Sequence, residues 1–171
     1  MSATRTLVSV EEYLRTVYQP DCDYVDGEVL ERNMAELDHS TLQGDLIGYF
    51  YMRRKEWNVR ILPEMRIQVK PTRFRIPDIC LVVGKTDEQI LTKPPFLCVE
   101  ILSPEDRWSR VKDRIDDFLA MGVPYVWVLD PQTKEAFIVT PTEGLREVKD
   151  GVLRTQNPTF EVPLSEFFSP T

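Results

Sequence analysis

Apolar residues recur at helical spacing in three stretches of the chain. A stripe of apolar residues along one helix face predicts an amphipathic helix packed on a core. The predicted helices lie at about residues 8–18, 40–57 and 105–121. Ser9, with Glu12 three positions later, is placed to cap the first helix, and Gly122 is placed to end the third.

Short apolar runs between these helices predict β-strands. Two of the runs carry an acid, Asp78 in 77–83 and Glu100 in 96–102. The run 125–129 is almost fully apolar, as expected of a strand that is buried on both faces. Further strands are predicted at 59–62, 65–69 and 136–139.

Turn signals and element order complete the predicted fold. Asp-Gly dipeptides suit tight β-turns, so hairpins are predicted at 22–31 and at 145–155. The strand, helix, strand order across 96–130 predicts a right-handed parallel crossover. We therefore expect a mixed α/β (α+β) fold, with a central mixed β-sheet flanked by helices and an N-terminal helix and β-hairpin, in a single domain spanning 1–171.

Composition narrows the class of protein. The chain has 171 residues, 42% of them hydrophobic, and a net charge of −7, which argues against a general nucleic-acid binder. The net charge does not exclude a local basic groove, because eight lysines and arginines lie between positions 53 and 75. The alternative for this cluster is a solvated surface. No apolar run approaches the roughly 20 residues of a membrane span, and no signal-peptide segment is evident, so we expect no membrane partner and a cytoplasmic location.

The two acids in apolar strands carry the clearest chemistry. If 77–83 and 96–102 pair as a hairpin, Asp78 lies close to opposite Glu100, with Cβ atoms about 5 Å apart. Two ionised carboxylates at that distance repel each other, and a divalent cation between them removes the conflict. Mg²⁺ suits the pair because it accepts one or two carboxylates and keeps its waters. Taken singly, Asp78 could be a turn residue and Glu100 could lie near an exposed strand end.

An ordered series of short motifs runs along the chain: Tyr24-Val25-Asp26-Gly27-Glu28, His39, Pro77-Asp78, Val99 to Pro104 and Gly122 to Pro131. This series resembles the Uma-two family of restriction endonucleases, in the PD-(D/E)XK nuclease superfamily. The resemblance covers nearly the whole chain. It implies a restriction-endonuclease-like core, Mg²⁺-dependent cleavage of DNA phosphodiester bonds, with Mn²⁺ as a possible substitute, and a homodimer.

The resemblance also implies roles for individual residues. Asp78 and Glu100 would be metal-binding catalytic acids, the backbone carbonyl of Ile101 would be a third ligand, and a metal-activated water would attack phosphorus. Glu28 and His39 match family positions, and Glu28 could add a metal ligand. Their alternatives are a polar hairpin residue and a residue at a helix N-terminus. Glu64 is a further candidate, with a loop position as its alternative.

The usual lysine of the superfamily motif is absent. That position, two residues after the second acid, is Leu102. The resemblance implies that in this branch the lysine comes from the following helix, where Arg114 occupies the family position and Lys112 lies two residues earlier. Arginine can stabilise negative charge but stays protonated and cannot act as a base. Either residue could instead be the solvated flank of an amphipathic helix, and helical periodicity does not choose between them.

Two functions are compatible with these observations. The first is a Mg²⁺-dependent DNA endonuclease that uses Asp78 and Glu100, with Arg114 or Lys112 in place of the lysine. The second is a catalytically inactive nuclease-fold domain that acts in nucleic-acid binding or protein interaction. The missing lysine and the acidic net charge favour the second. The apolar strands at 125–129 and 136–139 could form the interface of a homodimer.

Overall fold

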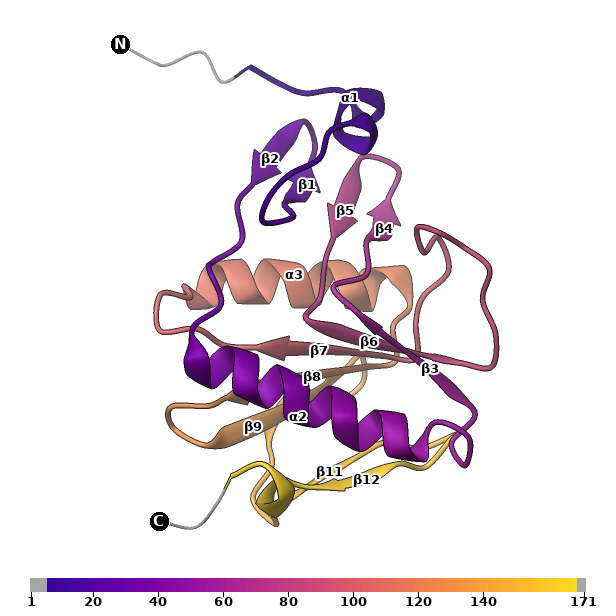
Figure 1. Cartoon of the computed structure of the whole chain (residues 1–171), viewed down its shortest axis with the longest axis vertical. Helices are drawn as coiled ribbons and strands as arrows, with labels where there is room; N and C mark the ends of the chain where they lie inside the picture. The colour runs from indigo at the N-terminus through magenta and orange to yellow at the C-terminus, as the bar shows by residue number, and fades with distance from the viewer. Residues whose placement is uncertain (1–5, 169–171) are drawn as a thin grey trace.

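The computed structural model describes residues 6–168 of the chain (Figure 1). Its helices are α1 (Val10–Arg15), α2 (Leu37–Arg53), α3 (Trp108–Met121) and a short 3-10 helix, η1 (Leu164–Glu166). Its strands are β1 (Asp23–Val25), β2 (Glu28–Leu30), β3 (Val59–Pro63), β4 (Ile67–Lys70), β5 (Arg73–Arg75), β6 (Ile79–Val83), β7 (Leu97–Ile101), β8 (Tyr125–Asp130), β9 (Glu135–Thr140), β10 (Gly144–Glu147), β11 (Val152–Arg154) and β12 (Glu161–Pro163).

The central sheet is mixed, as predicted. Within residues 6–168 its six strands follow the order β10-β9-β8-β7-β6-β3. Strands β7 and β8 are parallel, and α3 forms the crossover between them, while the other neighbouring pairs are antiparallel. Figure 1 shows α2 and α3 on opposite sides of these strands. The predicted mixed α/β fold with flanking helices is confirmed.

The middle strands β7 and β8 of the central sheet are buried on both faces, which explains their continuous apolar runs in the sequence. Every residue of β7 is buried. Leu97, Val99 and Ile101 pack in one core cluster with the buried face of α2. Cys98 packs in a second cluster with Val111, Ile115 and Phe118 of α3. Because side chains alternate along a strand, Glu100 lies on the same side of β7 as Cys98, towards α3.

A smaller sheet, β2-β1-β5-β4, packs beside α3. The predicted hairpin around Asp26-Gly27 forms its outer edge, and both turn residues have positive φ, 50° and 98°. Strand β1 also pairs with β5 through Tyr24 and Phe74. Tyr13 of α1 stacks on Tyr24, and Ser9 accepts the backbone N–H of Glu12 as N-cap. The N-terminal helix and hairpin are therefore confirmed, and they extend a sheet that the sequence did not predict.

The predicted hairpin at 145–155 is wrong. Leu145 lies on β10 and pairs with Val139 of β9. Leu153 lies on β11 and pairs with Val162 of β12. The two segments therefore pair outward with different strands, even though Asp150-Gly151 suits a tight turn between them. No helix in the part of the chain that the structure describes is long and apolar enough to cross a membrane.

Candidate active site

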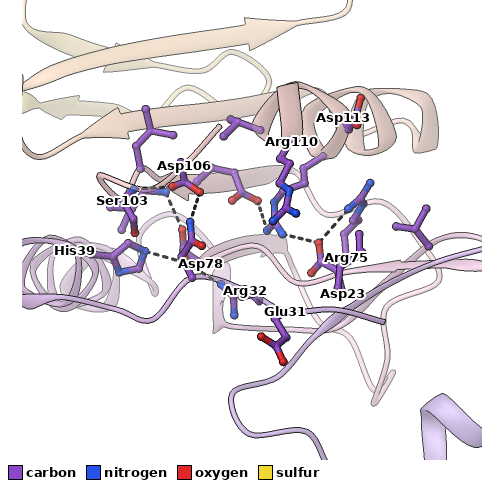
Figure 2. Close-up of a pocket in the computed structure, with 18 residues that line it drawn as sticks. Asp23, Glu31, Arg32, His39, Arg75, Asp78, Ser103, Asp106, Arg110 and Asp113 are labelled. Carbon is purple, nitrogen blue, oxygen red and sulfur yellow. Dashed lines mark hydrogen bonds and ion pairs between the residues drawn. The ribbon is translucent and has the colours of Figure 1, made fainter. Parts of the chain in front are cut away.

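A cavity of about 180 Å³ lies between α3, the ends of β6 and β7, and the segment after β2 (Figure 2). Charged side chains dominate its lining. Among the described residues these are six acids, Asp23, Glu31, Asp78, Glu100, Asp106 and Asp113, and four arginines, Arg32, Arg75, Arg110 and Arg114. His39 also lines the cavity. Asp78 and Glu100, the two strand acids singled out in the sequence, are therefore in this set.

Asp78 is held at the start of β6 by contacts to both of its carboxylate oxygens. It occupies a bend and is only 3% exposed. The backbone N–H of Ile101 donates to Oδ2 at 2.7 Å, and Oδ1 lies 2.9 Å from Arg32 Nη2 and 3.2 Å from His39 Nε2. Burial opposes ionisation, but the hydrogen bond from His39 and the charge of Arg32 outweigh it and hold the pKa of Asp78 below 3.8. Asp78 is therefore an ionised carboxylate at neutral pH.

Glu100 is the second buried acid of the cavity and is 7% exposed. The antiparallel pairing of β6 with β7 extends to the Ile79–Val99 pair, which brings Asp78 and Glu100 to the same end of the two strands. Glu100 Oε1 lies 2.9 Å from Arg114 Nη2. Burial raises the pKa of Glu100 to about 7, and the charge of Arg114 limits this rise.

Arg114 reaches Glu100 from α3 and is fixed by two further contacts. Its Nη1 lies 2.5 Å from Asp23 Oδ2, and its Nη2 donates to the carbonyl of Ile76 at 2.7 Å. Burial disfavours the charged guanidinium, but Asp23 and Glu100 outweigh it and raise the pKa of Arg114. Arg114 is therefore a permanent positive charge beside Glu100 and cannot accept a proton.

The remaining residues singled out in the sequence lie at different distances from this cavity. Lys112 is on the exposed side of α3, where Nζ lies 2.7 Å from Asp116, and it is not part of the lining. Glu28 lies on β2 and is also outside the lining. Glu64 Oε1 lies 3.9 Å from Arg32 Nη1, at the edge of the group around Asp78. Of the two residues proposed to replace the lysine, only Arg114 contacts an acid of the site.

His39 connects α2 to the cavity. Its Nε2 faces Asp78, while its Nδ1 is buried and has no hydrogen-bond partner among residues 6–168. Burial lowers the pKa of His39, but its hydrogen bond with Asp78 outweighs this effect, and the net shift is upward. His39 therefore helps to hold Asp78 in place.

The sequence did not point to Asp23, Arg32 or Arg75 as site residues. Asp23 accepts from Arg114, from Arg75 Nη1 at 3.2 Å and from the backbone N–H of Ile76 at 3.1 Å. Arg75 in turn donates from Nε to Asp117 at 2.8 Å. One signal was available, because Arg75 stands between Phe74 and Ile76, and a charge in an apolar strand needs a buried partner.

The carboxylate oxygens of Asp78 and Glu100 are ligands of the kind that a hard divalent cation prefers. No group of three or more His, Cys, Asp or Glu side chains within residues 6–168 is arranged to hold a metal ion. Mg²⁺, however, is commonly bound by only one or two carboxylates and completes its shell with water. Asp78 and Glu100 meet that requirement, although Arg32 and Arg114 neutralise them in this structure.

Comparison with known proteins agrees with the fold and the motifs. The family model Uma2, described as "Putative restriction endonuclease", matches residues 10–168. The chain belongs to this family. Restriction-endonuclease-like proteins generally use divalent metal ions. No curated protein matches the Uma2 chain.

A solved structure has the same fold as this Uma2 chain. It is a protein from Anabaena variabilis ATCC 29413 that is described as a putative nuclease belonging to DUF820. The two structures superpose with a TM-score of 0.81 at 20% sequence identity, over 95% of this chain and 98% of that one. At this identity the likeness shows a shared fold, and the chemistry has to be argued from the residues of the site.

Proposed function

We propose that this Uma2 chain is a Mg²⁺-dependent DNA endonuclease whose metal ligands are Asp78 and Glu100. The observation that supports it is the convergence of two buried acids from neighbouring strands in one cavity. Burying two carboxylates side by side is costly, and a bound divalent cation would offset that cost. Membership of the Uma2 family supports the same reaction class.

Each residue of the cavity has a distinct role in this proposal. Asp78, Glu100 and the carbonyl of Ile101 would hold the metal ion. A bound Mg²⁺ supplies Lewis-acid activation of water and neutralises charge on the phosphoryl oxygens. Arg114 adds a fixed positive charge where negative charge develops on the phosphate. Neither Lys112 nor Glu28 is part of this machinery, because both lie outside the cavity lining.

The supporting residues fix the orientation of these groups. His39 and Arg32 hold Asp78, since both contact its Oδ1. Asp23 holds Arg114, since it accepts from Nη1. Because Arg114 stays protonated, it cannot be the general base, and proton removal from water must use another acceptor.

Cleavage of plasmid and oligonucleotide DNA with Mg²⁺ or Mn²⁺ tests the proposal. Wild-type protein should cleave, EDTA should abolish cleavage, and Asp78→Asn and Glu100→Gln should each reduce the rate by about 100-fold or more. Glu56→Gln, which removes an exposed acid outside the cavity, is the matched control and should cleave like wild type. Activity that persists in both site variants would refute the assignment.

The ion pair between Arg114 and Glu100 favours a second candidate, a catalytically inactive nuclease-fold domain that binds nucleic acid or protein. In that case Arg114 takes the place of the cation rather than assisting it. Calorimetric titration with Mg²⁺ separates the two. A metal-binding signal that Glu100→Gln removes supports the nuclease, whereas DNA binding without any metal binding supports the inactive domain.

A further inference from the structure

Arg110 lies on α3 at the mouth of the proposed active site. It precedes Arg114 by one helical turn, so the two side chains emerge from the same side of the helix. Arg110 is exposed and lines the cavity together with Asp78 and Glu100. Figure 2 shows it extending from α3 towards the group of charged residues.

The guanidinium of Arg110 differs from those of the other cavity arginines in its contacts. Arg32 pairs with Asp78, Arg75 with Asp23 and Asp117, and Arg114 with Asp23 and Glu100. Arg110 has no side-chain hydrogen bond or ion pair within residues 6–168. It can therefore bind a ligand without breaking an internal ion pair, whereas a ligand of the other three must compete with a buried acid.

The acids of the cavity make such a cation necessary for an anionic ligand. Acids outnumber arginines in the lining, six to four among the described residues, so a phosphate entering the cavity needs a cation that no acid already holds. Asp106 forms no ion pair with Arg110 among the described residues; its carboxylate instead accepts from the Asn33 side chain and from the backbone N–H of Ser103. Asp113 and Glu31 line the same cavity, and neither forms an ion pair with Arg110 in the part of the chain that the structure describes.

We propose that Arg110 is a substrate-binding residue that holds a backbone phosphate of duplex DNA at the α3 side of the cavity. A planar guanidinium binds two phosphate oxygens in parallel, and DNA offers such a phosphate at every nucleotide. The assignment rests on the proposed function for the identity of its ligand. The assignment also specifies that the DNA approaches the cavity from the α3 side and that Arg110 makes the first contact with a phosphate.

Binding without cleavage tests this role. The probe is a short fluorescein-labelled DNA duplex, titrated in Ca²⁺ instead of Mg²⁺ at several salt concentrations and followed by anisotropy. Arg110→Ala should weaken binding about tenfold, the effect of one charge-assisted hydrogen-bond pair. It should also lower the slope of log Kd against log salt by about 1, which is the signature of one lost phosphate contact. Arg110→Lys keeps the charge and should restore the slope.

A matched control and a folding check make the outcome specific. Arg60→Ala removes an exposed arginine of edge strand β3, outside the cavity, and should keep both affinity and slope. All variants should melt at the temperature of wild type, because the Arg110 guanidinium has no partner to lose.

The possible results separate the two proposals. Arg110→Ala with unchanged affinity and slope overturns the role of Arg110 alone, as does an equal loss in Arg60→Ala. Wild-type protein that binds the duplex in Ca²⁺ but never cleaves in Mg²⁺ overturns the nuclease proposal. In that case a lower salt slope in Arg110→Ala still supports phosphate binding by Arg110, and an unchanged slope overturns it. Wild-type protein that neither binds nor cleaves overturns both.

Discussion

Arg114 Nη2 lies 2.9 Å from Glu100 Oε1, so the helix after the acidic strands delivers its cation to the second acid. The resemblance seen in the sequence implies a lysine two residues after the second acid, where this chain has Leu102. Here the positive charge comes from α3 and is anchored by Asp23 on the small sheet. The site therefore joins three parts of the fold, namely the central sheet, α3 and the hairpin sheet.

Removing Arg114 should destabilise the protein strongly. Arg114→Ala leaves Asp23 and Glu100 buried with one cation fewer, and breaking a buried ion pair costs about 3–5 kcal/mol. Urea unfolding measures the loss. Arg146→Ala on β10 is the control, because its pair with Glu143 is exposed, and it should change stability by about 0.5 kcal/mol or less. A loss below about 1 kcal/mol in Arg114→Ala would show that the cluster is not held as the structure has it.

Replacing Arg114 by lysine separates charge from geometry. Lysine keeps the positive charge near Glu100 but has no planar fork to reach Asp23 and Ile76 together. If charge on the phosphate is what matters, Arg114→Lys should keep DNA cleavage within about tenfold of wild type, while a neutral Arg114→Gln should lose about 100-fold or more. Equal losses in both variants would assign Arg114 a purely structural role. Single-turnover cleavage assays at saturating metal make the comparison.

Local sequence signals predicted the elements whose partners are near in the chain. Asp26-Gly27 predicted a hairpin because both turn residues need positive φ. Gly122 ended α3 in the left-handed conformation for the same reason. The two acid-bearing runs were considered as a hairpin, and the structure pairs them antiparallel as β6 and β7.

Contacts between residues far apart in the sequence could not be predicted from these local patterns. Asp23 meets Arg114 across 91 positions of sequence, and in a local pattern Asp23 is only a hairpin residue. The failed hairpin at 145–155 has the same origin. The Asp-Gly turn suits a hairpin between β10 and β11, but β10 pairs with β9 and β11 pairs with β12. A turn motif carries no information about such alternative partners. Arg32 likewise reaches Asp78 across 46 positions.

Two glycine-to-alanine substitutions should change stability in opposite directions. Gly122 has φ 109°, and a side chain there is strained even though the nearest atom to a new Cβ, in Pro94, is 3.6 Å away. Gly122→Ala should therefore cost about 1–2 kcal/mol. Gly48 lies on the exposed side of α2 with nothing within 4 Å of a new Cβ, so Gly48→Ala should stabilise by up to about 1 kcal/mol. Thermal and urea unfolding of both variants check the signs, and a stabilising Gly122→Ala would contradict the left-handed cap.

The turn of the β1–β2 hairpin should make stability depend on pH through Asp26. Hydrogen bonds from Arg73 and Thr72 hold the pKa of Asp26 below its ordinary value of 3.8. A depressed folded pKa adds stability that is fully present above the unfolded value and is lost as pH falls through the folded one. Asp26→Asn, which tolerates the positive φ of this position, should therefore be less stable than wild type at pH 7, and the difference should shrink below about pH 4.

NMR titration of the Asp26 carboxylate gives the direct measurement. The midpoint in the folded protein should lie below 3.8, and Thr72→Val, which removes one donor, should raise it while Arg73 remains. Arg73 also pairs with Asp117 on α3 at 3.0 Å, so the same contact ties the hairpin turn to the helix that carries Arg114. A midpoint at or above 3.8, or a stability difference that does not change between pH 7 and pH 3, would show that Asp26 and Arg73 are not paired in solution.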